Sequence, residues 1–235
     1  MKVAYDFHIH TALSPCGDAD MTPNNIVNMA ILKGLDAIAI TDHNTCANAK
    51  ACMDCAKETN LVVIPGMEVE TAEECHIVCL FADIESALCM ENVIDEHLPK
   101  IKNRTDIFGE QVIMDSQDNI VGYRENMLVT ATTLSINQVA DFARGFGGVA
   151  IPAHIDKSSY SILSNLGFID DNLGFKTVEV KHLNKLDEIY EEKELSRFRI
   201  IHSSDAHYLW DLSEKEHFIE ARSLDAGEII HSLLK

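Results

Sequence analysis

The sequence is short of basic residues, and this shortage limits the partners that its surface attracts. Its 235 residues include 19 lysines and arginines against 38 acidic residues, which gives a net charge of −19. An acidic surface repels the phosphates of nucleic acid unless metal ions or a local basic patch intervene, and it also favours solubility. We therefore expect no long nucleic acid as a partner.

Several sequence signals are also missing. No apolar run reaches the roughly 18 residues of a membrane helix, and the opening "MKVAYDFHIH" lacks the apolar segment of a secretory signal. Neither GxGxxG nor GxxxxGK[ST] follows a strand, which weakens a nucleotide-binding interpretation. We expect a cytoplasmic protein with no membrane partner, and nothing in the sequence indicates its oligomeric state.

Cysteine is present in an odd number, seven residues. Without an export signal, this number favours free thiols in a reducing compartment. Cys52 and Cys55 have CxxC spacing, but no second CxxC follows and the segment has a helical pattern. We interpret both as small buried side chains rather than as a metal-binding or redox pair.

Apolar β-rich runs alternate with helical patterns along the chain. The runs that predict strands are "VAYDF", "DAIAIT", "LVVIPGME", "HIVCLF", "GGVAIPAH", "KTVEVKH" and "RIIHSSDAH". Helices are expected in residues 22–34, 47–59, 91–103, 135–145, 158–166, 184–196 and 225–235, with Thr22 and Asp225 as N-caps. Such alternation is typical of an α/β fold with a mostly parallel sheet, either a TIM-like barrel or an open doubly wound sheet.

Residues 84–134 interrupt this alternation. Within them, two β-like runs flank "DSQDN" in residues 109–129 and predict a hairpin. Such an insertion is either a surface cap or a lid over a pocket. The chain has no linker or internal repeat, so residues 1–235 are expected to form a single domain.

Metal-ligating and charged side chains lie where the expected strands end. In a parallel barrel these ends share one face, where such enzymes place their chemistry. His76 instead begins a strand, but the segment after Glu68 is too short for a crossover helix. An antiparallel return would bring His76 to the same face, beside His8, His10, Asp42, His43, Glu68, His154, Lys181, His182, Asp205 and His207.

This convergence predicts a metal site. A lone buried histidine is more often a hydrogen-bonded core residue, but so many ionisable groups would repel one another without cations. Imidazoles and carboxylates without a cysteine at the strand ends suit Zn²⁺, Mn²⁺ or Fe better than Ca²⁺ or an iron–sulfur cluster.

The motifs resemble those of a known family. "HIHTALS", "TDHN", "GMEVE" with "HIVCLF", "IPAHID" and "SSDAH" occur in the order and spacing of the polymerase and histidinol phosphatase (PHP) family. The resemblance implies a distorted seven-stranded (β/α)7 TIM-like barrel with one antiparallel strand. It also implies two or three divalent metal ions, and the family's stand-alone members are mostly phosphoesterases.

The resemblance also implies roles for individual residues. His8, His10, Glu68 and Asp205 would hold a first metal, and Glu68 would bridge to a second metal held by His76 and His154. His43 and His207 would hold a third together with an acid from "SPCGDAD", for which we favour Asp18 over Asp20. Asp42 would orient a histidine rather than bind a metal.

The function that the resemblance implies is metal-dependent hydrolysis of a phosphate mono- or diester of a small molecule or nucleotide, so the expected partner is a small phosphorylated substrate. A metal-activated hydroxide would attack phosphorus, and Asp205 or His207 would manage protons. Candidate phosphate contacts are Ser14, Lys157, Lys181 and His182. An amidohydrolase-type enzyme and a non-catalytic metal-bound regulatory module are the alternatives. The absence of lysine from "HIVCLF" counts against the amidohydrolase.

Overall fold

A computed structural model describes residues 1–190 and 194–235. Its strands are β1 (Lys2–Ile9), β2 (Ala37–Ile40), β3 (Val62–Glu70), β4 (His76–Leu80), β5 (Val112–Met114), β6 (Ile120–Tyr123), β7 (Val149–Pro152), β8 (Thr177–Val180), β9 (Arg199–His202) and β10 (Phe218–Glu220). Its α-helices are α1 (Pro23–Leu32), α2 (Ala49–Ala56), α3 (Ile84–His97), α4 (Thr105–Phe108), α5 (Ile136–Gly145), α6 (Ile162–Leu166), α7 (Leu183–Tyr190) and α8 (Ala226–Leu233).

The main sheet has six strands in the order β10-β1-β2-β3-β4-β7. Strands β1, β2 and β3 are parallel, whereas β4 is antiparallel to both β3 and β7. The tight return at residues 71–75 therefore forms as the short spacing predicted, and it pairs His76 with Glu70. Gly66 is required at this pairing, because a Cβ atom there would lie 2.6 Å from the carbonyl oxygen of Cys79.

The expectation of a seven-stranded barrel is confirmed only as an α/β fold with a curled sheet. Strands β8 and β9 pair with each other in parallel and form a separate two-stranded sheet. Isolated backbone contacts connect this pair to the main sheet, from Ile155 to Glu179 beside β7 and between Ile9 and Ala206 beside β1. Both contacts lie near the ends of strands, where the predicted site residues are.

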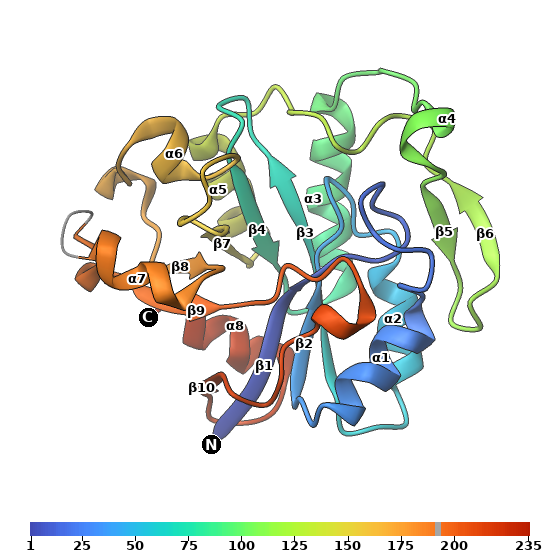
Figure 1. The fold of residues 1–235 in the computed structure, drawn as a ribbon, viewed down its shortest axis with the longest axis horizontal. Helices are drawn as coiled ribbons and strands as arrows, with labels where there is room; N and C mark the ends of the chain where they lie inside the picture. Colours follow the sequence, from blue (N-terminus) through green and yellow to red (C-terminus); the bar gives the residue numbers. More distant parts are fainter. Residues whose placement is uncertain (191–193) are drawn as a thin grey trace.

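Apolar side chains cover both faces of the curled sheet, and Figure 1 shows the arrangement of the helices around it. Helices α1, α2, α3 and α5 contribute to a core on one face, together with side chains such as Ile38 and Val63. Helix α8 packs on the other face through Ile229 and Leu233, against side chains that include Phe7. Both faces are thus buried, which fits the nearly continuous apolar runs of the central strands.

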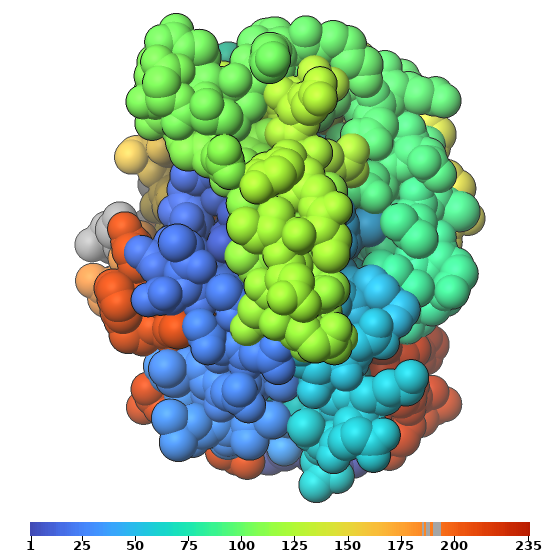
Figure 2. All heavy atoms as spheres, turned by 90° about the vertical axis from the view of Figure 1, so that its right-hand side faces the viewer, coloured from blue at the N-terminus to red at the C-terminus, as the bar shows by residue number. Residues whose placement is uncertain are grey.

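The excursion at residues 84–134 begins with α3, which packs on the sheet, and continues into a hairpin on the outside of the fold. Figure 2 shows its hairpin, β5 and β6, lying across the segments of α1 and α2. Asp118 accepts hydrogen bonds from the Thr22 hydroxyl (2.9 Å) and the Asn24 amide (3.0 Å) at the start of α1. Farther along, the Asn44 side chain donates to the carbonyl oxygens of Leu128 (2.7 Å) and Thr130 (3.0 Å). These bonds fix the end of the excursion beside the loop after β2, which carries the predicted site residue His43.

Most predicted elements are confirmed, including the hairpin and the N-caps Thr22 and Asp225. Helix α3 begins at Ile84, seven residues earlier than expected, because Asp83 caps it. The helix expected at 184–196 is observed as α7, and residues 191–193 lie outside the described residues. Strand β10 was not predicted. None of the described helices is long and apolar enough to cross a membrane.

Candidate metal centre

The ends of several strands bring the predicted ligands into one buried cluster. His8 and His10 end β1, His43 follows β2, and Glu68 lies in β3. The remaining members enter from β4, from the loop after β7 and from the loop after β9, and they are His76, His154, Asp205 and His207. These residues are buried except His207, which is partly exposed.

A first group of atoms surrounds His8 and His10. The two Nε2 atoms lie 3.2 Å apart. His8 Nε2 is 3.3 Å from Glu68 Oε1, and His10 Nε2 is 3.4 Å from Glu68 Oε2. Asp205 Oδ1 completes the group at 3.6 Å from His8 Nε2 and 3.4 Å from His10 Nε2. We call these four residues the inner group.

Glu68 extends from the inner group toward three further histidines. Its Oε1 lies 2.8 Å from His76 Nδ1 and 3.0 Å from His154 Nε2. Its Oε2 lies 3.0 Å from His43 Nδ1. One fully buried carboxylate thus contacts imidazoles on both sides, which is the arrangement needed to bridge two cations.

The inner histidines are oriented from behind by hydrogen bonds through Nδ1. His8 Nδ1 donates to Glu179 Oε1 (2.9 Å), and His10 Nδ1 to Ser14 Oγ (3.1 Å). The Ser14 hydroxyl in turn donates to Asp42 Oδ1 (2.7 Å). Since each Nδ1 is a donor, each Nε2 keeps a free lone pair toward the cluster, as metal ligation requires.

The cluster contains buried polar atoms that a metal ion could bind. Glu68 Oε2, His76 Nδ1 and His154 Nδ1 are buried and have no hydrogen-bond partner in the described structure. The first two lie at contact distance from their neighbours without hydrogen-bonding geometry. Buried polar atoms without hydrogen bonds are costly, and cations in the cluster would satisfy Glu68 Oε2 and His76 Nδ1.

Electrostatics hold two of these groups, Glu68 and His10, in the ionisation states of metal ligands. Burial alone would raise the pKa of Glu68, but the imidazoles beside it, His76 foremost, hold it well below its usual range. Burial together with the neighbouring His207 and His43 lowers the pKa of His10 well below its ordinary value. Metal binding requires this combination of an ionised carboxylate and a neutral imidazole.

At His8 the neighbouring carboxylates act in the opposite direction. Burial would lower the pKa of His8, but the carboxylates of Glu179, Glu68 and Asp205 raise it well above its usual range. A bound metal would therefore replace a proton on that ring.

Two residues of the centre adopt a backbone conformation that side chains rarely take. His154 has φ of 30° and Asp205 has φ of 50°. Left-handed backbone of this kind costs about 1–3 kcal/mol per residue and gathers at functional sites. The fold therefore accepts local strain to aim these two side chains at Glu68 and the inner histidines.

The third predicted group differs from the expectation in one residue. Sγ of Cys16 and ring nitrogens of His10, His43 and His207 all lie within 4.8 Å of one another. Asp18, which we expected there, is absent from this cluster, and its Oδ1 accepts a hydrogen bond from the Asp20 amide (2.9 Å). The sequence carries a signal for Cys16, since it lies between the HxH motif and Asp18.

A cavity of about 250 Å³ opens above the cluster. Besides the ligands, its walls include Lys157, whose Nζ lies 3.1 Å from Asp205 Oδ2, and the aromatic ring of Tyr160. Burial would lower the pKa of Lys157, but the Asp205 carboxylate raises it, so the ammonium stays charged. The cavity thus combines metal-ligating groups, one cation and one aromatic ring.

Only one of the four expected phosphate contacts lines this cavity, and it is Lys157. Ser14 is buried behind His10. Lys181 bonds to the carbonyl oxygens of Ser204 and Asp205 and lines a different hollow. The exposed His182 pairs with Asp156 (2.8 Å).

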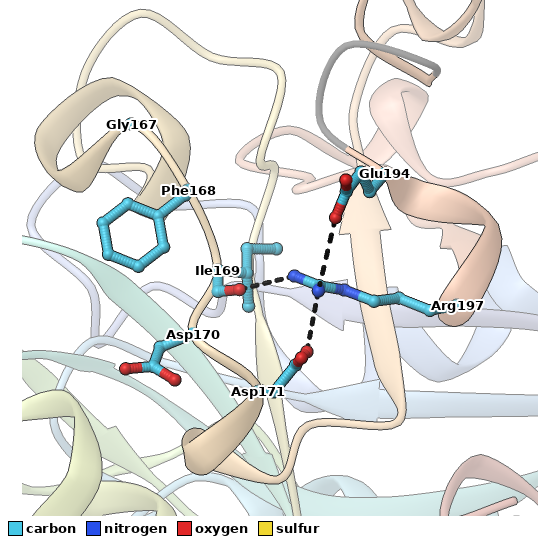
Figure 3. A pocket seen from close by; sticks show the side chains of 7 residues that line it. All are labelled: Gly167, Phe168, Ile169, Asp170, Asp171, Glu194 and Arg197. Atoms are coloured by element: carbon cyan, nitrogen blue, oxygen red, sulfur yellow. Dashed lines mark hydrogen bonds and ion pairs between the residues drawn. The ribbon is translucent and has the colours of Figure 1, made fainter.

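A second hollow, of about 410 Å³, lies beside Arg197 (Figure 3). The Arg197 guanidinium donates to the Ile169 carbonyl and pairs with Asp171 (2.7 Å) and Glu194 (3.8 Å). Its charge is therefore already compensated, and none of the metal-ligand groups formed by the described residues lies there. Candidate metal ligands line the smaller cavity instead.

The sequence was also compared with protein families and curated proteins. The family model of the PHP domain matches residues 6–142. The Methanocaldococcus jannaschii protein MJ1587 is 36% identical over 101 residues, which cover 39% of this chain and 58% of that protein. The 5'-3' exoribonuclease Rnm of Escherichia coli is 36% identical over 94 residues, which cover 38% of this chain and 31% of the enzyme. The chain therefore matches less than two thirds of these relatives' own length.

Solved structures share the fold. The lesion-specific endonuclease EndoQ from Pyrococcus furiosus superposes with a TM-score of 0.69 at 17% identity, covering 100% of this chain and 56% of that one. A complex of Endonuclease Q with a 27-mer duplex substrate that has an abasic lesion at the active site gives 0.69 and 17%, covering 97% and 55%. At this identity the likeness establishes the fold alone.

These comparisons contradict the expected partner, a small phosphorylated substrate and no long nucleic acid. A protein of similar sequence is an exoribonuclease, and a protein of similar fold is bound to a 27-mer duplex. The exclusion rested on the net charge of −19, which averages over the whole surface. It ignored the local field at the cavity, which Lys157 and candidate metal ligands line.

Proposed function

The chain belongs to the PHP domain family, and on that premise we propose that it is a metal-dependent phosphoric ester hydrolase acting on nucleic acid. The observation that carries the proposal is the convergence of His8, His10, Glu68 and Asp205, with four further histidines, beneath a single cavity. No other cavity of the described residues joins such a set of ligands to a charged lysine.

We propose that the cluster holds two or three divalent ions. His8, His10, Glu68 and Asp205 would hold one, and Glu68, His76 and His154 a second. When bound, such ions lower the pKa of water and neutralise charge on a phosphoryl group. Two side chains orient the ligands through hydrogen bonds, Glu179 behind His8 and Ser14 behind His10.

Substrate contacts are assigned to the residues that line the cavity. Lys157 would contact a phosphate oxygen, because it lines the cavity and its ammonium lies beside Asp205 Oδ2. Asp205 has one oxygen toward the inner histidines and the other toward Lys157, which places it to accept a proton from the attacking water.

A nucleobase would find an aromatic contact at the rim. Tyr160 lines the cavity, is 46% exposed and stacks on His76 with ring centroids 4.9 Å apart. The residue has φ of 55°, so its backbone is held in a rarely populated conformation. Stacking on aromatic side chains is how proteins bind single-stranded nucleic acid with little sequence preference.

Nucleic acid is the substrate class that the relatives support. Exoribonucleases are similar in sequence, and an endonuclease bound to a duplex is similar in fold. The acidic surface of this chain would then restrict binding to segments that reach the metal ions, rather than favour tight binding along a long duplex. The excursion at 84–134 contributes Val129 to the cavity wall, and we propose that its end helps to select the substrate.

Hydrolysis of short labelled RNA and DNA oligonucleotides, single-stranded and duplex, tests the proposal. We expect cleavage that EDTA abolishes and that added Mn²⁺ or Zn²⁺ restores. Lys157→Ala should raise KM, whereas Lys50→Ala should not, because Lys50 lies on the surface of α2 and pairs with Asp54. Cleavage that is indifferent to chelation would refute the metal-dependent mechanism, and hydrolysis of amides or lactones instead would favour the amidohydrolase alternative. Intact metal content without hydrolysis of any ester would favour the regulatory module.

A further inference from the structure

The metal-ligating atoms of the described residues form three overlapping groups. Two of them share Glu68, one with His8 and His10 and the other with His43 and His76, and we call the third, which lacks Glu68, the second group. The inner group contains two carboxylates and two histidines. The second group contains no carboxylate and consists of Cys16 with ring nitrogens of His10, His43 and His207. Cys16 is an exposed free cysteine, whereas the inner group is buried.

His10 belongs to both groups, but its contacts assign it to the inner one. Its Nε2 lies 3.4 Å from both Glu68 Oε2 and Asp205 Oδ1, and its Nδ1 is bonded to Ser14. His10 also does not line the cavity, whereas the other three members of the second group do. Cys16, His43 and His207 are therefore left as an outer trio at the cavity mouth.

The backbone holds Cys16 in this position from both sides. The Gly17 amide donates to the Ser14 carbonyl (2.8 Å), and the Asp18 amide donates to the His207 carbonyl (2.8 Å). At Gly17 a Cβ atom would lie 2.3 Å from the carbonyl oxygen of Thr11, so the turn excludes any larger residue. The loop that carries the thiol is thus attached to the segment that carries His207.

We propose that Cys16, His43 and His207 form a thiolate–imidazole metal site at the cavity mouth, selective for Zn²⁺ over Mn²⁺. This inference rests on the proposed metal-dependent function and deepens it by assigning the outer ion its own chemistry. Thiolate and imidazole prefer zinc, whereas Mn²⁺ and Mg²⁺ prefer oxygen ligands. Three protein ligands also leave a fourth tetrahedral position open, as in catalytic rather than structural zinc sites.

The proposal separates the metals of one cavity by ligand type. The inner group offers carboxylate oxygens, which Mn²⁺ accepts, whereas the outer trio offers none. A protein loaded with Mn²⁺ should therefore fill the outer position poorly until Zn²⁺ or Co²⁺ is added. His43 connects the two positions, because its Nδ1 lies 3.0 Å from Glu68 Oε2.

Cobalt spectroscopy tests the thiolate ligand without an activity assay. The full chain is stripped of metal, titrated with Co²⁺ under reducing conditions, and scanned for the near-ultraviolet sulfur-to-cobalt charge-transfer band. Wild type should show the band, Cys16→Ser should lose it, and Cys89→Ser should keep it. Cys89 is the matched control because it is also exposed but lies on α3 and belongs to none of the metal-ligand groups.

Competition between Zn²⁺ and Mn²⁺ provides the second measurement. Cys16→Ser should lose one tightly held zinc or weaken its binding more than about tenfold, whereas Cys16→Asp should retain that ion but accept Mn²⁺ more readily. Circular dichroism establishes that each variant is folded. A wild-type protein that binds Co²⁺ without the band, or a band that survives in Cys16→Ser, overturns the proposal.

The two proposals fail in different ways. If the chain cleaves oligonucleotides with bound metal but shows no charge-transfer band, the thiolate site is refuted and the proposed function stands. If it binds no metal at all, both are refuted.

Discussion

Replacing Glu179 by glutamine tests how far the residues behind the centre control its metal affinity. Glu179 is buried, and its Oε1 accepts hydrogen bonds from His8 Nδ1 (2.9 Å) and from the His154 amide (3.1 Å). Glutamine keeps the shape and can keep an oxygen at Oε1, but it removes the charge. The change therefore isolates the charge assistance of one hydrogen bond.

The magnitude follows from that loss of charge. A hydrogen bond to a charged group contributes about 1.5–3 kcal/mol, against about 0.5–1.5 kcal/mol for a neutral one. The difference of about 1–1.5 kcal/mol corresponds to a five- to tenfold weaker affinity of the inner group for metal. Glu179→Ala removes the bond entirely and should cost ten- to a hundredfold.

Competition with a chromophoric chelator measures these affinities directly. Glu70→Gln is the control, because Glu70 lines the same cavity but has no hydrogen bond to His8. It removes the same charge and therefore reports the long-range electrostatic effect alone. If Glu179→Gln weakens metal binding no more than Glu70→Gln does, the orienting role of Glu179 is refuted.

Three further substitutions test separate parts of the account. Tyr160→Ala should raise KM for single-stranded oligonucleotides several-fold with little change in kcat, whereas Tyr160→Phe should not; equal KM values in steady-state assays would exclude base stacking. Gly17→Ala should displace the Cys16 loop, which would lower the zinc content while circular dichroism stays native; unchanged zinc content would contradict the tight turn. Asp225→Ala should destabilise the fold by about 1 kcal/mol at pH 7, because Asp225 caps α8. Hydrogen bonds from Ser223 and Glu228 lower the pKa of Asp225, so this advantage is present at neutral pH and disappears as the pH falls below about 4; a pH-independent difference in urea unfolding would refute it.

The fold could be predicted where one local pattern determined each element. The seven main strands are apolar runs that end in polar motifs, and Thr22 before Pro23 marks the start of α1. The antiparallel return to His76 followed from the short spacing between Glu68 and His76 alone. The seven-stranded barrel that we expected is not confirmed, because β8 and β9 form a separate sheet. Pairing between β7 and β8 and between β9 and β1 would depend on long-range contacts that no local pattern encodes.

The residues of the site were also predictable to different degrees. His8, His10 and Glu68 stand in compact motifs at strand ends, so the sequence alone indicated their convergence. Glu179 lies inside β8 and looks like an ordinary strand residue until His8 is placed beside it. Cys16 was not predicted, because its proposed role depends on a turn that carries its sulfur, rather than the carboxylate of Asp18, toward His207.

Anomalous diffraction from crystals grown with Mn²⁺ and Zn²⁺ tests the central claim most directly, because it locates each ion. The account places two or three peaks in the cavity, within about 2.0–2.3 Å of the ligand atoms, with zinc rather than manganese beside Cys16. A cavity without a peak in metal-loaded crystals, with Glu68 and its histidines bonded only to one another or to water, would contradict it.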